Sequence, residues 1–516
     1  MSLARRLIRN TFANWIALAV GALASFVLAP YMIGYLGPER FGLYQISRQF
    51  VAYLILFDLG ILGAVMRFSA EGVAAGDAIR VNAVTNSALV VYGAIAIAGL
   101  AVCIAAGYAA PDFFRVDAAY IEETRLLFWG LGLWWAGTML GYPARGILIA
   151  HQRYDLLALI NASGWVLLVV IIIVLFESGH VDLVVVAAAF VVGGVLQLIA
   201  FTLAAHRTHA PLRWAVRHVS RKTLRELGGF GSWNLLFTIA GLFLWSTDSI
   251  LIGRMLGAAV VPFYAIPFLL ISHGHALVRG FSAPLTPAAA TLAMQDPGQL
   301  RAILLRGTRI ALILVLASNG MLIILAEDLF RLWIGPAYAP SWVIYACLVA
   351  SFWFVAAHLP AYNILLGAGD IRRPAAAVLL ATTVALLMKI AIARDTGLIG
   401  VALVNVICLL PVMGIYLPRC ACRLARMSLA YLYRHAYLPP LLGFAPVAML
   451  GWLAVHYRPP HNLFELVIYL GGLSTFYLLL AFHFLDADER STILGVLRRA
   501  ARRLGGARSL RRGSGA

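Results

Sequence analysis

Apolar windows long enough to cross a bilayer follow one another along almost the whole chain. A membrane-spanning helix needs about 20 predominantly apolar residues, and the sequence contains fourteen such windows separated by short polar segments. They cover approximately residues 11–33, 44–68, 83–107, 124–150, 155–176, 183–205, 230–253, 263–290, 306–328, 342–367, 376–394, 398–417, 437–456 and 463–485. The pattern predicts an all-α, polytopic membrane protein with about fourteen transmembrane helices.

Composition excludes a large soluble domain. The 516 residues are 62% hydrophobic and only 12% charged, which is far from the average of soluble proteins. The longest polar stretches, 206–229 and 486–516, are too short to bury a core of their own. Five cysteines lie in or beside apolar windows without the spacing of a disulfide framework or a zinc site. We therefore expect free thiols, no metal and no cofactor.

Basic residues predict the orientation of the chain in the membrane. If the N-terminus starts inside, 26 of the 40 lysines and arginines fall in inside segments and 5 in outside segments. Cytoplasmic loops retain basic residues, so both termini are expected in the cytoplasm. The net charge of +18 is then explained by these loops, and no nucleic-acid partner is predicted.

A weak internal repeat suggests two related halves. At an offset of 220 residues, Asn14, Gly21, Leu36, Gly37, Tyr44 and Ile46 match Asn234, Gly241, Leu256, Gly257, Tyr264 and Ile266. Coincidence between apolar helices is the alternative explanation. If the repeat is real, the two halves have the same orientation, and transporters built in this way place their site between two lobes near the middle of the membrane.

The repeat and the polar segments together predict the domain organisation. We expect one six-helix lobe over 1–205, a basic cytoplasmic linker over 206–229 and a second six-helix lobe over 230–417, around a central cavity. Two additional transmembrane helices follow over 437–485, and a basic cytoplasmic tail over 486–516. This tail either lies on the anionic inner leaflet or serves mainly to fix the topology.

Cationic side chains inside the apolar windows are candidates for substrate binding. A charge at the centre of a bilayer costs about 2.5–3.5 kcal/mol on insertion scales, so it normally faces a partner or a wet cavity. The candidates are Arg279, Lys389, Arg48 and His275, and cations on separate helices suit a diffuse anion such as a pyrophosphate. Structural pairing is the alternative for each of them.

Two carboxylates lie well inside the windows, away from their ends: Asp248 and Asp58. Asp248 is either an ion-coupling carboxylate or a partner that holds Arg279 or Lys389 in place, and Asp58 has the same two interpretations. Asp248 corresponds to Leu28 in the first half of the repeat, so its charge is an addition to the repeated scaffold. This asymmetry favours a role in mechanism.

Other polar residues favour a structural interpretation. Arg67 and Arg145 lie near inner ends of windows, where a long side chain can reach the headgroups. His273 and His275 are two apart, so on a helix they face different directions and do not form a metal site. Neither lysine of the chain follows a glycine in a phosphate-binding loop, and no outer loop is long enough for a catalytic site. We expect a protein that is not an enzyme and has no catalytic residues.

Four segments resemble the Wzx-type polysaccharide flippases, which belong to the multidrug/oligosaccharidyl-lipid/polysaccharide exporter superfamily. They read GYLGPERFGLYQ, FDLG, WNLLFTIAGLFLWSTDSILIGRMLGAAVVPFY and LLGAGDIRRP. The resemblance implies a two-lobed helical transporter that works by alternating access. It also implies a cation-lined cavity, to which Arg279, Lys389 and Arg48 are the candidates to contribute.

The same resemblance implies a substrate and a location. The substrate would be undecaprenyl-diphosphate-linked oligosaccharide, flipped to the periplasmic leaflet of the bacterial inner membrane for O-antigen, capsule or exopolysaccharide biosynthesis. Partners would be the lipid bilayer and the polysaccharide polymerase and chain-length machinery. Two alternatives remain open: an ion-coupled drug or metabolite antiporter of the same superfamily, and a non-transporting membrane component of polysaccharide assembly. An antiporter would be expected to carry more acids than cations in its windows, and this chain does not.

Overall fold

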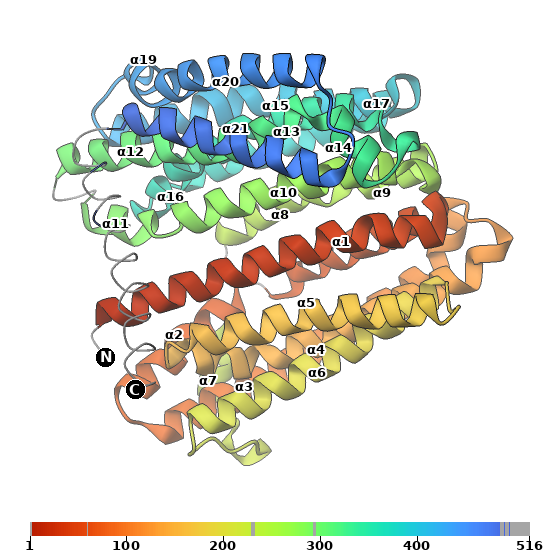
Figure 1. Ribbon diagram of the computed structural model, residues 1–516. Coiled ribbons are helices and arrows are strands. Elements are labelled where there is room, and N and C mark those ends of the chain that lie inside the picture. The colour runs from red at the N-terminus through yellow and green to blue at the C-terminus, as the bar shows by residue number, and fades with distance from the viewer. Residues whose placement is uncertain are drawn as a thin grey trace, which may run out of the picture. The chain divides into compact units, whose positions relative to one another are not determined.

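The computed structural model describes residues 3–58, 60–228, 233–292, 296–485, 490 and 495. Over these residues the protein is built from helices and turns and contains no strand (Figure 1), which confirms the predicted all-α class. The predicted cytoplasmic tail, 486–516, lies outside the described residues except for 490 and 495, so its position stays a prediction.

The first half of the chain forms seven helices joined by short turns. These are α1 (Leu3–Ala52), α2 (Ile61–Ala74), α3 (Ala78–Phe114), α4 (Ile121–Ala150), α5 (Tyr154–Glu177), α6 (Leu183–Thr208) and α7 (Arg221–Gly228). Aspartates begin two of them: Asp77 accepts a hydrogen bond from the backbone N–H of Arg80, and Asp182 accepts one from that of Val185. Such caps satisfy backbone donors that have no partner inside the helix.

The second half contains more, and shorter, helices. They are α8 (Trp233–Trp245), α9 (Thr247–Met255), α10 (Pro262–Ser282), α11 (Leu285–Leu292), α12 (Pro297–Val315), α13 (Met321–Ile324), α14 (Ala326–Trp333), α15 (Ser341–Ala357), α16 (Leu359–Gly367), α17 (Arg372–Leu409), α18 (Leu417–Leu424), α19 (Leu429–Leu432), α20 (Leu438–Tyr457) and α21 (Leu463–His483). Short 3-10 segments include η1 (Tyr53–Asp58) and η4 (Ala258–Val260), and π-helical turns include η5 (Leu316–Gly320), η7 (Leu410–Tyr416) and η8 (Tyr433–Tyr437).

Nine helical segments within the described residues are long and apolar enough to cross a membrane. Two of them, Trp15–Asp58 and Arg372–Leu424, each extend over parts of two predicted windows. Other predicted windows are divided instead. The helix is interrupted at Ser246 in window 230–253, for example, and between α10 and α11 in window 263–290. The predicted number of fourteen helices and the cytoplasmic position of both termini therefore stay predictions.

Contacts divide the chain into two compact units. We call them unit 1 (Met1–His273, Trp333–Ser351 and Arg372–Val412) and unit 2 (Gly274–Leu332, Phe352–Ile371 and Met413–Ala516). In unit 1, α4 packs between α3 and α6, and α1 packs on α5 (Figure 1). In unit 2, α20 packs on α21, and α11 packs on α16. These units are defined by contacts and do not test the lobe boundaries predicted from the sequence, which stay a prediction.

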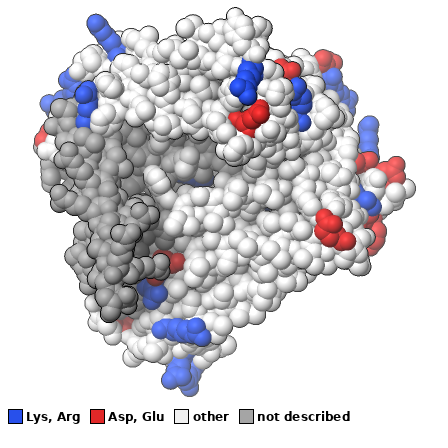
Figure 2. Space-filling view, in the orientation of Figure 1, with Lys and Arg blue, Asp and Glu red and all other residues white. Residues whose placement is uncertain are grey.

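The outer faces of the helices are apolar. On α5 of unit 1, Val166, Val170 and Val174 follow one another at helical spacing, and all three are exposed. Figure 2 shows one face of the protein on which charged side chains are sparse and uncharged residues cover most of the surface. Exposed apolar faces of this extent are expected where lipid, rather than water, surrounds the helices.

Both Leu-Gly pairs of the predicted repeat form the same kind of turn. Gly37 has φ 75° and ψ 172°, and Gly257 has φ 101° and ψ 155°. Residues other than glycine adopt this region only with strain, so these two glycines interrupt the helix at matching positions. The agreement supports the repeat. The side chains of Asn14 and Asn234, which open the two copies in the sequence, lie outside the described residues.

The helical segment that follows the first turn touches the second turn inside unit 1. A Cβ atom added to Gly42 would lie 1.9 Å from the backbone carbonyl oxygen of Ala258, at the start of η4. Gly42 therefore permits a close approach of backbone to backbone that no other residue allows. The first copy of the repeat is packed against the second at this point.

Two buried asparagines hold the predicted linker onto α3. Asn82 accepts a hydrogen bond from the N–H of Arg213 (2.6 Å) and donates one to the carbonyl of Pro211 (3.0 Å). Asn86 donates to the carbonyl of Arg213 (2.8 Å) and accepts from the N–H of Ala215 (2.9 Å). The amides thus satisfy backbone groups of an irregular segment, which attaches this part of 206–229 to unit 1.

We expect Gly42→Ala to destabilise the protein and Gly34→Ala to leave it intact. At Gly42 the new methyl group would collide with a backbone carbonyl, and overpacking of this kind costs about 1–3 kcal/mol. At Gly34, on the same helix, a Cβ meets nothing within 4 Å. The midpoint of thermal unfolding in detergent measures the difference, and equal midpoints for the two variants would contradict the close contact.

Candidate functional site

A buried ion pair lies inside unit 1, between α9 and α17. The ammonium of Lys389 donates a hydrogen bond to Oδ1 of Asp248 at 2.5 Å, and the two side chains are only 2% and 4% exposed. The other carboxylate oxygen, Oδ2, accepts hydrogen bonds from the Tyr264 hydroxyl and from Asn405 Nδ2, the latter at 3.2 Å. We call these four residues the Asp248 cluster.

The cluster accounts for how a carboxylate and an ammonium can lie inside an apolar bundle. Removing an ion from water costs several kcal/mol, and the attraction between opposite charges compensates for it only when hydrogen bonds satisfy the remaining atoms. Asp248 has three donors here. The sequence left open whether Asp248 pairs with Arg279 or with Lys389; in the structure its partner is Lys389. An ion-coupling role for Asp248 stays a prediction.

Asp58 lies in a different environment, at the end of η1. It is half-buried, and the Tyr92 hydroxyl donates a hydrogen bond to its Oδ1 at 2.6 Å. Within the described part of the chain, no basic side chain comes within ion-pair distance of it. Asp58 is thus held by a phenol, and the structure does not bring it together with a cation.

Arg48 lines a partly open cavity within unit 1, to which α1, α4, α5 and α6 contribute residues. We call it the Arg48 cavity; its volume is about 230 Å³. Its polar wall consists of Arg48, Arg145, Thr138, Asn161 and Gln197. Its aromatic wall consists of Trp134, Trp165 and Phe190. Polar and aromatic groups thus converge on one space inside an otherwise apolar helix bundle.

The two arginines of the cavity are held by aromatic groups. Arg48 donates a hydrogen bond to the Tyr44 hydroxyl at 3.1 Å, and its guanidinium lies 5.7 Å from the ring centre of Phe190. Arg145 lies 5.3 Å from the ring of Tyr142 and 5.1 Å from that of Phe201. Neither arginine forms an ion pair with any residue that the structure describes.

The remaining predicted binding residues lie on the second part of α10, which belongs to unit 2 from Gly274 onward. Arg279 is exposed, whereas His275, four residues earlier, is buried. The four candidate cationic residues are therefore in three different settings. Lys389 is enclosed in the Asp248 cluster, Arg48 lines the cavity, and Arg279 and His275 belong to the other unit.

Sequence reasoning missed most of the cavity. It assigned Arg145 a structural role near a helix end, but the structure places its side chain in the cavity wall. It did not single out Asn161, Gln197 or the two tryptophans. A usable signal was present, because Asn161 and Gln197 are amide side chains inside apolar windows, where polar groups normally face a partner or water.

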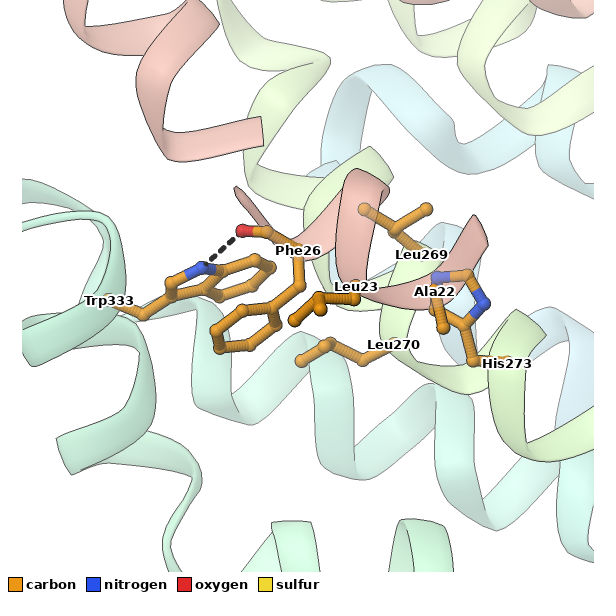
Figure 3. A pocket seen from close by; sticks show the side chains of 7 residues that line it. All are labelled: Ala22, Leu23, Phe26, Leu269, Leu270, His273 and Trp333. Carbon is orange, nitrogen blue, oxygen red and sulfur yellow. Dashed lines mark hydrogen bonds between the residues drawn. The ribbon is translucent and has the colours of Figure 1, made fainter. Parts of the chain in front are cut away.

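A second, apolar pocket of about 270 Å³ also lies within unit 1. We call it the Trp333 pocket. It is lined by Ala22, Leu23 and Phe26 of α1, by Leu269, Leu270 and His273 of α10, and by Trp333 (Figure 3). The indole of Trp333 stacks on the Phe26 ring with centroids 4.3 Å apart and donates a hydrogen bond to the Phe26 carbonyl at 2.8 Å. The indole is thus fixed at one end of a space with little polar lining.

We expect the two charges of the Asp248 cluster to depend on each other. Lys389→Met leaves a buried carboxylate without its cation, which typically costs about 3–5 kcal/mol. The double variant Asp248→Asn, Lys389→Met removes both charges and should unfold at a higher temperature than Lys389→Met alone. The thermal midpoint in detergent tests this.

The matched control is Lys222→Met, at the only other lysine of the chain. Lys222 is exposed on α7, so its loss should leave the midpoint unchanged. Strictly additive effects of the two single substitutions at Asp248 and Lys389 would contradict their coupling.

The profile of a family described as polysaccharide biosynthesis protein matches residues 7–281, which is more than half of the chain. The membrane protein EpsK of Bacillus subtilis (strain 168) is 23% identical over 459 residues, or 86% of this chain and 87% of EpsK. A Shigella flexneri protein named as a proposed O-antigen transporter is 20% identical over 263 residues, or 51% of this chain and 61% of that protein.

Solved structures with a similar fold are transporters. The lipid II flippase MurJ in an inward closed conformation gives a TM-score of 0.68 at 14% identity, covering 92% of this chain and 98% of MurJ. An inward-facing multidrug resistance transporter of the MATE family gives a TM-score of 0.66 at 16% identity, covering 80% and 96%. At these identities the likeness shows the fold alone.

These findings confirm the predicted fold class and a multi-pass membrane protein, and the bacterial inner membrane fits the two bacterial relatives. They also confirm the family resemblance seen in the sequence: the chain belongs to the polysaccharide biosynthesis protein family.

Proposed function

We propose that this protein flips undecaprenyl-diphosphate-linked oligosaccharide from the cytoplasmic to the periplasmic leaflet of the bacterial inner membrane. In this proposal it works by alternating access and catalyses no chemical reaction. Its product would supply O-antigen, capsule or exopolysaccharide biosynthesis, together with a polysaccharide polymerase and chain-length machinery. The observation that supports it most directly is the Arg48 cavity, a cationic and amide-lined space among apolar helices.

The lining of the cavity favours an anionic, hydroxyl-rich substrate. Arg48 and Arg145 have no carboxylate partner among the described residues, and a guanidinium forms strong charge-assisted hydrogen bonds with phosphate or carboxylate. Asn161 and Gln197 offer both donors and acceptors, which sugar hydroxyls require. A glycan attached through a diphosphate combines these two kinds of group.

The same geometry argues against a cationic drug as the substrate. A cation inside the bundle would need an available carboxylate. Asp248 is already bonded to Lys389, Tyr264 and Asn405. Family membership and the Shigella relative named for O-antigen transport also favour a polysaccharide precursor.

A lipid-linked substrate also needs a surface for its hydrocarbon chain. The Trp333 pocket lies in the same unit as the Arg48 cavity, and all its lining side chains except that of His273 are hydrophobic. Unit 1 therefore offers one polar and one apolar pocket, which suits a substrate that has a polar sugar headgroup and an apolar hydrocarbon chain.

We expect a strain without this protein to accumulate its lipid-linked oligosaccharide in the cytoplasmic leaflet. Without a polar path, the sugar headgroup would have to cross the hydrocarbon core unsolvated. Periodate that cannot cross the inner membrane, added to spheroplasts, oxidises only the outward-facing sugars and so reports the leaflet. Equal oxidation with and without the protein would refute the proposal.

Arg279→Ala should lower the rate of export at least about tenfold, because loss of a charge-assisted hydrogen bond costs about 1.5–3 kcal/mol. Arg279 is exposed on α10, so the substitution leaves no cavity and the protein should remain stable. The same periodate assay measures the effect, with Lys222→Ala as the control. Export at the wild-type rate would remove Arg279 from the binding residues.

A further inference from the structure

We propose that the Arg48 cavity binds one sugar ring that carries an anionic group, so that the protein discriminates acidic from neutral glycans at this place. The inference rests on the proposed function and adds to it a substrate subsite within unit 1. The anionic group is either a sugar carboxylate or a glycosyl phosphate, since both present the same oxygen acceptors to a guanidinium.

The size of the cavity sets the size of its ligand. Its volume of about 230 Å³ is below the range of about 300–1,000 Å³ that is usual for sites enclosing a whole drug-sized molecule. At about 30 Å³ per molecule of liquid water, it holds the equivalent of about eight waters. This is room for a single ring with its substituents, and the rest of an oligosaccharide would have to lie outside.

The charge of the cavity sets the charge of its ligand. Arg48 uses one nitrogen for the Tyr44 hydroxyl, while Arg145 makes no hydrogen bond with any described residue. Both keep their charge because a guanidinium does not lose its proton in proteins. Two cations that line one space, with no counter-ion among the described residues, repel each other, and an anion bound in that space would relieve this repulsion.

Aromatic and amide groups supply the features that distinguish a sugar from a simple anion. Trp134 and Trp165 come from α4 and α5, and an indole offers a flat apolar surface to the C–H face of a ring. Trp134 is held edge-on against Phe190, with centroids 5.3 Å apart. An inorganic anion would need only the two guanidiniums, so the two tryptophans and two amides in the wall favour a sugar as the ligand.

One glycine makes room for an amide of the wall. A Cβ atom at Gly164 would lie 2.1 Å from Nε2 of Gln197, so any larger residue would displace that side chain. Gln197 donates only a long hydrogen bond of 3.5 Å to the Ile160 carbonyl. Its amide therefore retains acceptor and donor capacity toward the cavity.

Ligand-observed NMR on the purified full-length protein tests the proposal. The probes are methyl glucuronide, glucose 1-phosphate and methyl glucoside, with inorganic phosphate as a competitor. We expect at least one of the two acidic probes to bind at least tenfold more tightly than the neutral glucoside. Preference for the glucuronide would identify the sugar carboxylate as the ligand, and preference for glucose 1-phosphate would identify the glycosyl phosphate.

Variants connect the binding to the cavity. Arg145→Gln should reduce the affinity for the acidic probe at least tenfold, to that of the glucoside, while Arg145→Lys should retain part of it. Arg67→Gln is the matched control, because Arg67 is exposed and paired with Glu71 at 2.8 Å. Each variant is first checked for an unchanged thermal midpoint, and if Arg145→Gln unfolds early, Arg48→Gln replaces it.

Three results would overturn the proposal: equal binding of acidic and neutral probes, no binding of any sugar, or displacement by inorganic phosphate as effective as that by glucose 1-phosphate itself. These results are independent of the leaflet measurement. If the deletion strain accumulates inward-facing lipid-linked sugar but the cavity binds no acidic ring, only the subsite is refuted. If deletion has no effect on the leaflet, the proposed function fails instead.

Discussion

The buried ion pair between Asp248 and Lys389 is the interaction on which the packing of unit 1 depends. It joins residues 141 positions apart in the sequence, and Tyr264 and Asn405 complete the hydrogen bonds of the carboxylate. Apolar helix faces can shift against each other at little cost, whereas a charged group in a low-dielectric interior requires all its partners at once. The cluster therefore specifies how α9, α10 and α17 meet.

The fold class follows from length and hydropathy alone, since a run of about 20 apolar residues can be accommodated only as a membrane-spanning helix. Helix ends were less predictable. The Leu-Gly pairs marked the turns at Gly37 and Gly257 because glycine has access to positive φ. The interruption at Ser246 was not predicted, because serine ends a helix only where tertiary contacts favour it.

Site residues could be predicted from the sequence where a charged side chain lies inside an apolar window, because burying that charge is costly. Asp248 and Lys389 stood out because a charge in an apolar window needs a partner, although the sequence did not decide which partner. For Arg145 the sequence favoured a structural role, and its distance from a helix end says nothing about the helices that cover it. Here α5 and α6 contribute residues to the cavity that its side chain lines. Asn161 and Gln197 gave too weak a signal, since an amide can bond to its neighbouring backbone.

The attachment of the linker to α3 has a consequence for how this protein can change over evolutionary time. In the linker, Asn82 and Asn86 bind main-chain atoms of Pro211, Arg213 and Ala215, and within α3 they also donate to the carbonyls of Ala78 and Asn82. The identities of Arg213 and Ala215 are therefore free to drift, provided that the backbone keeps its path and its N–H groups. The two asparagines have no such freedom, because only an amide side chain of that length presents a donor and an acceptor together.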